Sequence, residues 1–84
     1  MDPKKTLAKA LSGSRNIRFD DLVSLAQALG FVKKRTSGSH NIFSRPGIPE
    51  LLNVQNVSGQ AKPYQVRQLL RLVEKYDLRI GENE

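Results

Sequence analysis

The sequence predicts an α+β domain in which a three-stranded antiparallel sheet carries its helices on one face, giving two layers. The 84 residues, 38% hydrophobic and 26% charged, are enough for one small core and leave no room for a second domain. Apolar residues recur with helical spacing near both ends of the chain, whereas those between them alternate as in strands. Two amphipathic helices can cover one face of such a sheet. We therefore expect residues 1–84 to form a single domain.

A short first helix is expected over residues 4–11. Asp2 is a common type of N-cap residue, and Pro3 suits the first helical position. Leu7 and Leu11 would lie on one side of this helix, and the Ser-Gly-Ser sequence that follows would end it. We expect the helix to pack on the edge of the two layers.

A second helix is expected with Asp20 and Asp21 in its first turn, where their charges suit the positive end of the helix dipole. Its apolar residues repeat at positions i, i+3, i+4 and i+7, which form one helical stripe: Leu22, Leu25, Ala26 and Leu29. Gly30 is a typical helix stop, because glycine adopts the left-handed conformation that often ends helices.

After Gly30 the pattern changes to an alternation of period two. Strands are expected over residues 31–36, 40–45 and 51–57, with turns at Ser37-Gly38-Ser39 and Pro46-Gly47 and a boundary at Pro49. In the second strand, Asn41 and Phe43 share one face, and the other face carries His40, Ile42 and Ser44. Phe43 is interpreted as a core residue rather than a base-stacking platform, because it belongs to this alternation.

A final helix begins at Pro63, after the polar loop 58–62. Its apolar stripe has the same spacing as that of the second helix: Val66, Leu69, Leu70 and Val73. The loop lacks the spaced glycines and the Gly-Lys-Ser/Thr ending of a P-loop, which argues against nucleoside triphosphate binding.

The net charge of +6 is concentrated in one part of the chain. Residues 31–71 contain Glu50 as their one acid, whereas the remainder has seven basic and seven acidic residues that cancel. A localised basic surface is typical of a protein with a polyanionic partner, although a solvated face with no partner has the same composition. The basic residues of this stretch are Lys33, Lys34, Arg35, Arg45, Lys62, Arg67 and Arg71.

Several classes of site are excluded or disfavoured by composition. The chain has no cysteine, which excludes disulfides, cysteine-ligated metals and thiol nucleophiles, and its one histidine is too few for a typical zinc site. Asp20 and Asp21 point in different directions on a helix, so they do not form a two-metal nuclease centre. We expect no cofactor and no metal.

No apolar run reaches membrane-spanning length and no signal peptide is evident, so we expect a cytoplasmic protein without a membrane partner.

His40 is the residue most suited to catalysis. It follows a turn and begins a predicted strand, so we expect it at a sheet edge. A single histidine is usually an ordinary surface residue, but this one lies in the basic stretch, and an imidazole can accept and donate a proton near neutral pH. RNA carries its own nucleophile, the 2′-OH, so one proton-transfer group and nearby cations would suffice to cleave it without a metal.

The other candidate residues would bind phosphate or shape the site. Gly38 is expected to permit a tight turn that leaves the backbone open near His40. Lys62 and Arg67 would extend the track of phosphate contacts along the final helix. The phosphate contacts nearest to His40 would come from Lys33, Lys34, Arg35, Ser39 and Arg45.

The order of these motifs resembles the HicA toxins, RNA-cleaving toxins of bacterial type II toxin–antitoxin systems. The resemblance covers residues 18–78 and is densest over residues 38–47. It is carried by Gly30-Phe31, Gly38-Ser39-His40-Asn41-Ile42-Phe43, Pro46-Gly47, and Lys62-Pro63 before Val66-Arg67-Gln68-Leu69-Leu70.

The resemblance implies a double-stranded-RNA-binding-like α-β-β-β-α fold over residues 18–80, preceded by an N-terminal extension, residues 1–17. It implies that His40 is the active-site histidine of an mRNA-cleaving enzyme. It also implies a HicB-like antitoxin that covers the active surface. Residues 53–57 lack the second histidine that many members carry, so the complementary proton-transfer group is unassigned.

Two other functions remain open from the sequence. The domain would be a non-catalytic module if it bound structured RNA through phosphate and 2′-OH contacts alone. Residues 4–29 would otherwise form a helix-turn-helix that binds DNA. The second alternative is disfavoured, because the basic excess lies outside those helices and two aspartates would face the phosphates.

Overall fold

The helices and strands follow one another in the predicted order and confirm the α+β class. The computed structural model describes residues 1–81. Its elements are α1 (Pro3–Leu11), α2 (Phe19–Ala28), β1 (Val32–Ser37), β2 (His40–Arg45), β3 (Ile48–Gln55) and α3 (Pro63–Tyr76).

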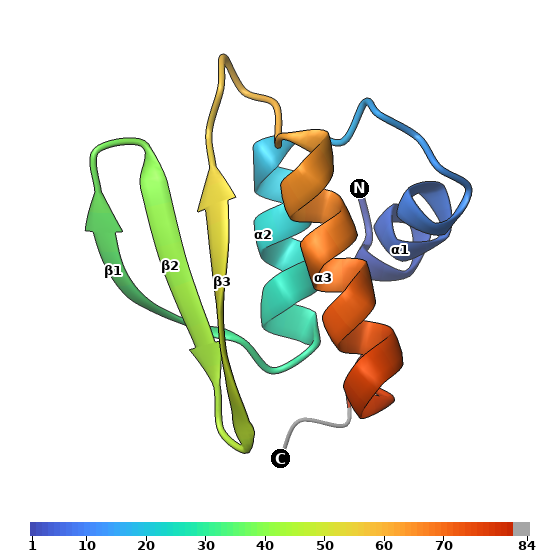
Figure 1. Ribbon diagram of the computed structural model, residues 1–84. Helices are drawn as coiled ribbons and strands as arrows, with labels where there is room; N and C mark the ends of the chain where they lie inside the picture. The colour runs from blue at the N-terminus through green and yellow to red at the C-terminus, as the bar shows by residue number, and fades with distance from the viewer. Residues whose placement is uncertain (82–84) are drawn as a thin grey trace.

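The three strands form one antiparallel sheet in the order β1-β2-β3, so β2 is the central strand (Figure 1). Two hairpins connect them: Ser37 pairs with His40 across the first turn, and Arg45 pairs with Ile48 across the second. The pairing of β1 with β2 is irregular between Lys33 and Arg35, where β1 contains one extra residue. Such a bulge changes the direction of the strand locally.

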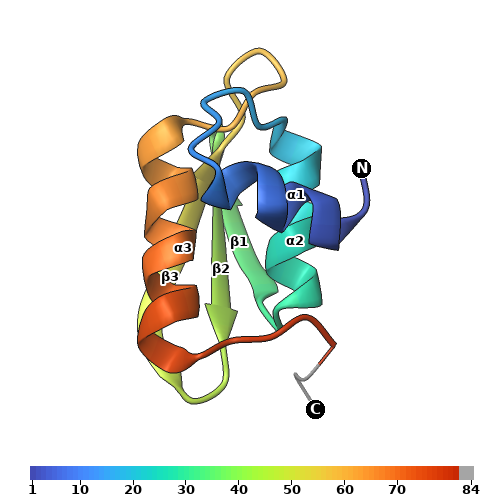
Figure 2. The same ribbon diagram turned by 90° about the vertical axis from the view of Figure 1, so that its right-hand side faces the viewer.

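Helices α2 and α3 lie side by side over one face of the sheet, with the sheet on one side and α1 on the other (Figures 1 and 2). The core lies between the sheet and this helix pair, as the alternation of period two in β2 and β3 predicts. Its largest fully buried apolar side chains include Leu22, Leu25, Leu29, Phe31, Phe43, Leu52, Val54 and Leu69. The prediction that Phe43 belongs to the core is confirmed.

The first helix packs differently from the expectation. It contacts α2 and α3 on their side away from the sheet, so it forms a third layer rather than covering an edge. Its buried residues are Thr6 and Ala10, whereas Leu11 is 66% exposed. The reason is that α2 and α3 already fill the covered face of the sheet, and small residues one turn apart let α1 approach them closely.

The predicted ends of the helices are confirmed where the chain provides capping groups. The Asp2 side chain accepts a hydrogen bond from the Lys4 N–H at 2.8 Å, which caps α1. Gly30 follows α2 with φ of +96°. The N–H of Phe31 donates to the carbonyl of Ala26, five residues back, in the manner of a Schellman motif.

The third strand begins earlier than predicted, at Ile48, and ends at Gln55. Pro49 therefore lies within β3 instead of marking its boundary. This is possible because β3 is an edge strand, where the N–H that proline lacks is not required for pairing. Leu52 and Val54 are buried as their alternation predicts.

Candidate functional site

His40 lies at the first position of the central strand, directly after the turn formed by Gly38 and Ser39. It is therefore flanked by β1 and β3 and is not on an edge strand, which corrects the expectation. Gly38 has a φ of +59°, as expected for the first central residue of a tight two-residue hairpin turn that glycine favours. The imidazole is half-buried and reachable from solvent.

His40 lies on the sheet face that no helix covers, here called the open face. Residues paired across antiparallel strands project to the same side, and alternate residues along a strand do so too. Because Asn41 and Phe43 are buried toward the helices, His40 and Ile42 project the other way. Their partners in the pairing complete the open face around the ring: Arg35, Ser37, Asn53 and Gln55.

Two amides of β3 contact the turn and the ring. The Asn53 side chain lies beside Nδ1 of His40, with its nitrogen at 2.9 Å and its oxygen at 3.2 Å. Gln55 donates from its side-chain nitrogen to the Ser39 hydroxyl at 3.2 Å. Sequence reasoning did not single out either amide, although the alternation of β3 places both on the same face as His40.

Arg35 is the cation that the fold brings nearest to His40 among the three basic residues of β1. It pairs with Ile42, which makes it a diagonal neighbour of His40 on the open face, with β carbons expected within roughly 8 Å. Lys33 pairs with Phe43 and so projects to the other side at the sheet edge, and Lys34 lies in the bulge. All three are exposed, and none forms an ion pair with an acid within residues 1–81.

Arg45 is separated from His40 by the length of β2, roughly 16 Å at 3.3 Å per residue. Its Nε donates at 2.8 Å to the carbonyl of Leu29, the C-cap residue that follows α2. The side chain is half-buried and pairs in the sheet with the buried Ile48. The fold thus uses Arg45 to satisfy a helix-end carbonyl and does not bring it to the histidine.

The start of α3, which Lys62 precedes, lies at the end of the molecule that holds the β1–β2 turn (Figure 1). Lys62 is the N-cap residue of α3, and its ammonium lies 5.9 Å from the ring centre of Tyr64. The start of α3 is tied to the end of β3, because the N–H of Gln55 donates to the side-chain oxygen of Gln65 at 2.7 Å. Lys62 therefore lies near the end of the sheet that holds His40, but it forms no hydrogen bond with the His40 imidazole.

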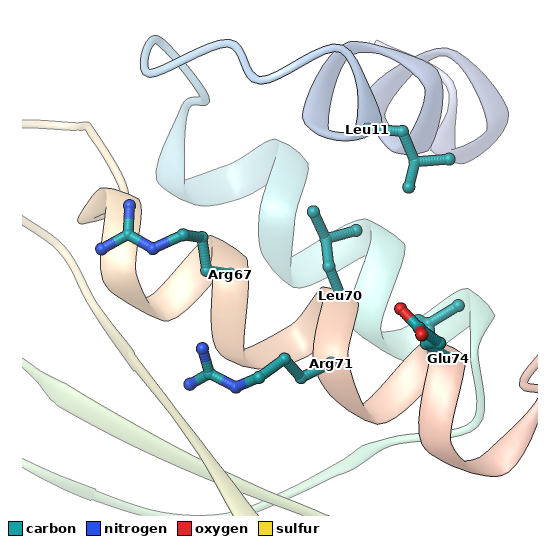
Figure 3. A pocket seen from close by; sticks show the side chains of 6 residues that line it. Leu11, Arg67, Leu70, Arg71 and Glu74 are labelled. Atoms are coloured by element: carbon teal, nitrogen blue, oxygen red, sulfur yellow. The ribbon is translucent and has the colours of Figure 1, made fainter.

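Arg67 lies on the helical side of the molecule, away from the open face. It lines a groove of about 510 Å³ between α1 and α3, where Leu11 of α1 faces Leu70 of α3 (Figure 3). Arg71 and Glu74 line the same groove. The structure therefore divides the predicted basic stretch into a sheet part near His40 and a helix part around this groove.

Glu50, the one acid of the basic stretch, is occupied by contacts with α3. It accepts hydrogen bonds from Nζ of Lys75 at 2.8 Å and from the hydroxyl of Tyr76 at 2.5 Å. These two hydrogen bonds lower the pKa of Glu50 from 4.5 to about 2, and the bond from Lys75 has the larger effect. Glu50 thus remains ionised near neutral pH and serves to join β3 to α3, not as a proton donor to the site.

Over residues 1–81, no three His, Cys, Asp or Glu side chains come together as ligands of a metal ion would. None of the helices in this part of the chain has the length and apolar character needed to cross a membrane.

Comparison with protein-family models gives a match to part of the chain. The family model described as the HicA toxin of bacterial toxin–antitoxin systems matches residues 19–74, which is more than half of the chain. The matched segment contains α2, the sheet and most of α3, and it leaves α1 outside. Searches of curated proteins and of solved structures find no match.

Proposed function

The chain belongs to the HicA family of toxins of bacterial toxin–antitoxin systems, and on this premise we propose that it is an endoribonuclease that cleaves mRNA. We propose His40 as its catalytic residue and RNA, bound on the open face, as its substrate. Membership in the family makes an antitoxin its partner. We propose a HicB-like protein for that role, acting in the cytoplasm, and a HicA-like core at residues 18–80 preceded by an extension at residues 1–17.

The observation that carries the proposal is the placement of His40. A half-buried imidazole lies on an uncovered sheet face, and Arg35, a cation without an acidic partner in the described residues, is its diagonal neighbour. A polyanion can approach this face directly. Ser39 belongs to the turn before His40, and Lys62 caps the start of α3. Lys33 and Lys34 lie further along β1 at the exposed edge of the sheet, with Lys33 projecting away from the open face. We propose these residues as the surrounding phosphate contacts.

The proposed reaction needs no nucleophile from the protein. The 2′-oxygen of the RNA attacks the adjacent phosphorus, so an O2′–P bond forms and the P–O5′ bond breaks. His40 takes the proton of the 2′-OH, and the departing 5′-oxygen acquires a proton from water. Proton transfer of this kind contributes about 10²–10⁴-fold to a rate. Arg35 would stabilise the charge that develops on the phosphate oxygens.

The test is incubation of the purified protein with mRNA in EDTA, followed by analysis of the fragment ends. We expect fragments that end in a 2′,3′-cyclic phosphate and begin with a 5′-OH, because those are the products of 2′-OH attack. RNA that stays intact while binding tightly and in a salt-sensitive way would instead identify a non-catalytic RNA-binding module.

A further inference from the structure

We propose that Asn53 is a positioning residue that keeps a proton on Nδ1 of His40 and so makes Nε2 the reactive nitrogen. This inference rests on the proposed nuclease function, which gives the ring a proton to transfer. It assigns a role to a residue of β3 in a region of the chain that lacks a second histidine.

The contact between the two side chains is specific. Both polar atoms of the Asn53 amide lie within hydrogen-bond distance of Nδ1, at 2.9 Å for the nitrogen and 3.2 Å for the oxygen. Among residues 1–81, neither side chain has another hydrogen-bond partner in the protein. Nε2 is therefore left without a protein partner in this part of the chain, at a ring that solvent reaches.

The strand pairing holds Asn53 in place. His40 pairs with Gln55 and Ile42 pairs with Asn53, so the two residues are diagonal neighbours on the open face. Leu52 and Val54, on either side of Asn53 in the chain, are both fully buried. Because these neighbours anchor the backbone, Asn53 can change its contact with His40 mainly by rotating its amide group.

The orientation of this amide decides what the ring can do. If the amide oxygen faces Nδ1, it accepts an Nδ1–H bond, and the neutral ring keeps its lone pair on Nε2, where it can accept the 2′-OH proton. If the amide nitrogen faces Nδ1, Nδ1 must accept, and the neutral ring carries its proton on Nε2, which then cannot act as a base. In the structure the amide nitrogen is the nearer atom, at 2.9 Å against 3.2 Å for the oxygen, so the proposed state requires the amide to turn its oxygen to Nδ1; rotation by half a turn exchanges the two orientations.

The oxygen-facing orientation also serves the protonated ring. An imidazolium donates from both nitrogens, so the Asn53 oxygen can accept from Nδ1 before and after Nε2 loses its proton. The same contact thus spans the proton-transfer cycle without rearrangement. Holding the tautomer of a catalytic imidazole is the task that the third member of a Ser-His-Asp triad performs.

The test uses the single histidine of the chain, whose ring gives one set of ¹⁵N resonances without interference. The tautomer and the titration of His40 are measured by NMR in the wild type and in Asn53→Ala and Asn53→Asp. Gln55→Ala is the matched control, since Gln55 is the neighbouring open-face amide and contacts Ser39 instead of the ring. The NMR spectra also report whether each variant is folded.

We expect the wild type and Asn53→Asp to hold the neutral ring with its proton on Nδ1, and Asn53→Ala to show a mixture of tautomers. The carboxylate of Asn53→Asp also favours the charged ring, so its titration should move to higher pH. In cleavage assays Asn53→Ala should lower kcat by about 10-fold, well short of the roughly 10⁴-fold cost of a fixed wrong tautomer in a triad, because a mixture keeps some rings in the reactive tautomer. KM should stay unchanged, and Gln55→Ala, whose side chain contacts Ser39 and not the ring, should keep the wild-type tautomer of His40.

Identical tautomers and titrations in the wild type, Asn53→Ala and Asn53→Asp would overturn the inference, as would a neutral wild-type ring with its proton on Nε2. A failure of the proposed nuclease function would give a different experimental result. If the tautomer depends on Asn53 but the wild type leaves RNA intact, the positioning role stands and the nuclease proposal falls.

Discussion

Both ends of strand β2 have charged or polar side chains nearby, but those at one end stay exposed and those at the other end bond to other parts of the fold. At one end, His40 and its diagonal neighbour Arg35 lie on the open face, and Arg35 has no acidic partner within the described residues. At the other end, the Nε of Arg45 is bound to the carbonyl of Leu29, and Glu50 is bound to α3. The first end keeps its polar groups available, whereas the second uses them to hold the fold together.

The difference follows from the direction in which each side chain projects. Arg35 pairs with Ile42 on the open face, whereas Arg45 pairs with Ile48, which is buried toward the helices. Both arginines contribute equally to the net charge of +6. Charge in a sequence therefore indicates a binding surface only where the fold leaves that charge without an internal partner.

The largest expected effect concerns the chemistry at the His40 end and changes the substrate. Replacement of the 2′-OH by hydrogen at a mapped cleavage position should abolish cleavage there, because the proposed nucleophile is removed. Binding should change little, since the phosphates remain. Cleavage is followed on gels and binding by fluorescence anisotropy. Continued cleavage at the 2′-deoxy position would show that the nucleophile comes from elsewhere.

The next effect concerns stability at the Arg45 end. Arg45→Ala should lower the free energy of unfolding by about 1–3 kcal/mol, because the partly buried carbonyl of Leu29 loses a charged donor. Chemical denaturation measures this, with Arg35→Ala as the matched control, expected within about 0.5 kcal/mol of the wild type. Equal destabilisation by the two variants would contradict the claim that Arg45 stabilises the fold and Arg35 does not.

A smaller effect is expected on the salt dependence of RNA binding, measured in a His40→Ala background to prevent cleavage. Each contact to a phosphate of single-stranded RNA contributes about 0.7 to the slope of log K against log salt. Arg35→Ala should reduce the slope by roughly that amount. Arg67→Ala should change it less, because Arg67 lines the groove on the helical side. A larger reduction of the slope by Arg67→Ala than by Arg35→Ala would indicate that RNA binds on the helical side and not on the open face.

The smallest effect is the pH dependence of the Glu50 contact. Folding lowers the pKa of Glu50 from 4.5 to about 2, so the stabilisation that its ionised form provides is complete above pH 4.5 and is lost as the pH falls toward 2. Glu50→Gln should therefore lower the Tm at pH 7, and the difference from the wild type should shrink over that acidic range. A difference that is constant with pH would show that Glu50 titrates alike in the folded and unfolded chains.

Much of the fold follows from local patterns in the sequence. The helical stripe of Leu22, Leu25 and Leu29, the stop at Gly30 and the alternation around Phe43 each have one physical interpretation, and the structure agrees with it. The position of α1 and the start of β3 do not follow from such patterns. They depend on which faces the other elements leave free and on β3 being an edge strand, and both are properties of the assembled fold.

The candidate site was predictable only in part. His40 and the cations of β1 could be identified from residue type and proximity in the chain. The contact of Asn53 with His40 depends on the pairing of β2 with β3, and the bond from Arg45 to Leu29 depends on where α2 ends relative to the sheet. Residue type alone cannot distinguish a phosphate-binding arginine from one that satisfies a carbonyl.

The most direct test of the account is the rate at which His40→Ala cleaves RNA under single-turnover conditions in EDTA. Its Tm and RNA affinity, measured alongside, establish that the variant is folded and binds substrate. We expect a rate about 10²–10⁴-fold below that of the wild type, because a proton-transfer group has been removed. A folded His40→Ala protein that cleaves at the wild-type rate would contradict the assignment of catalysis to the open face of the sheet.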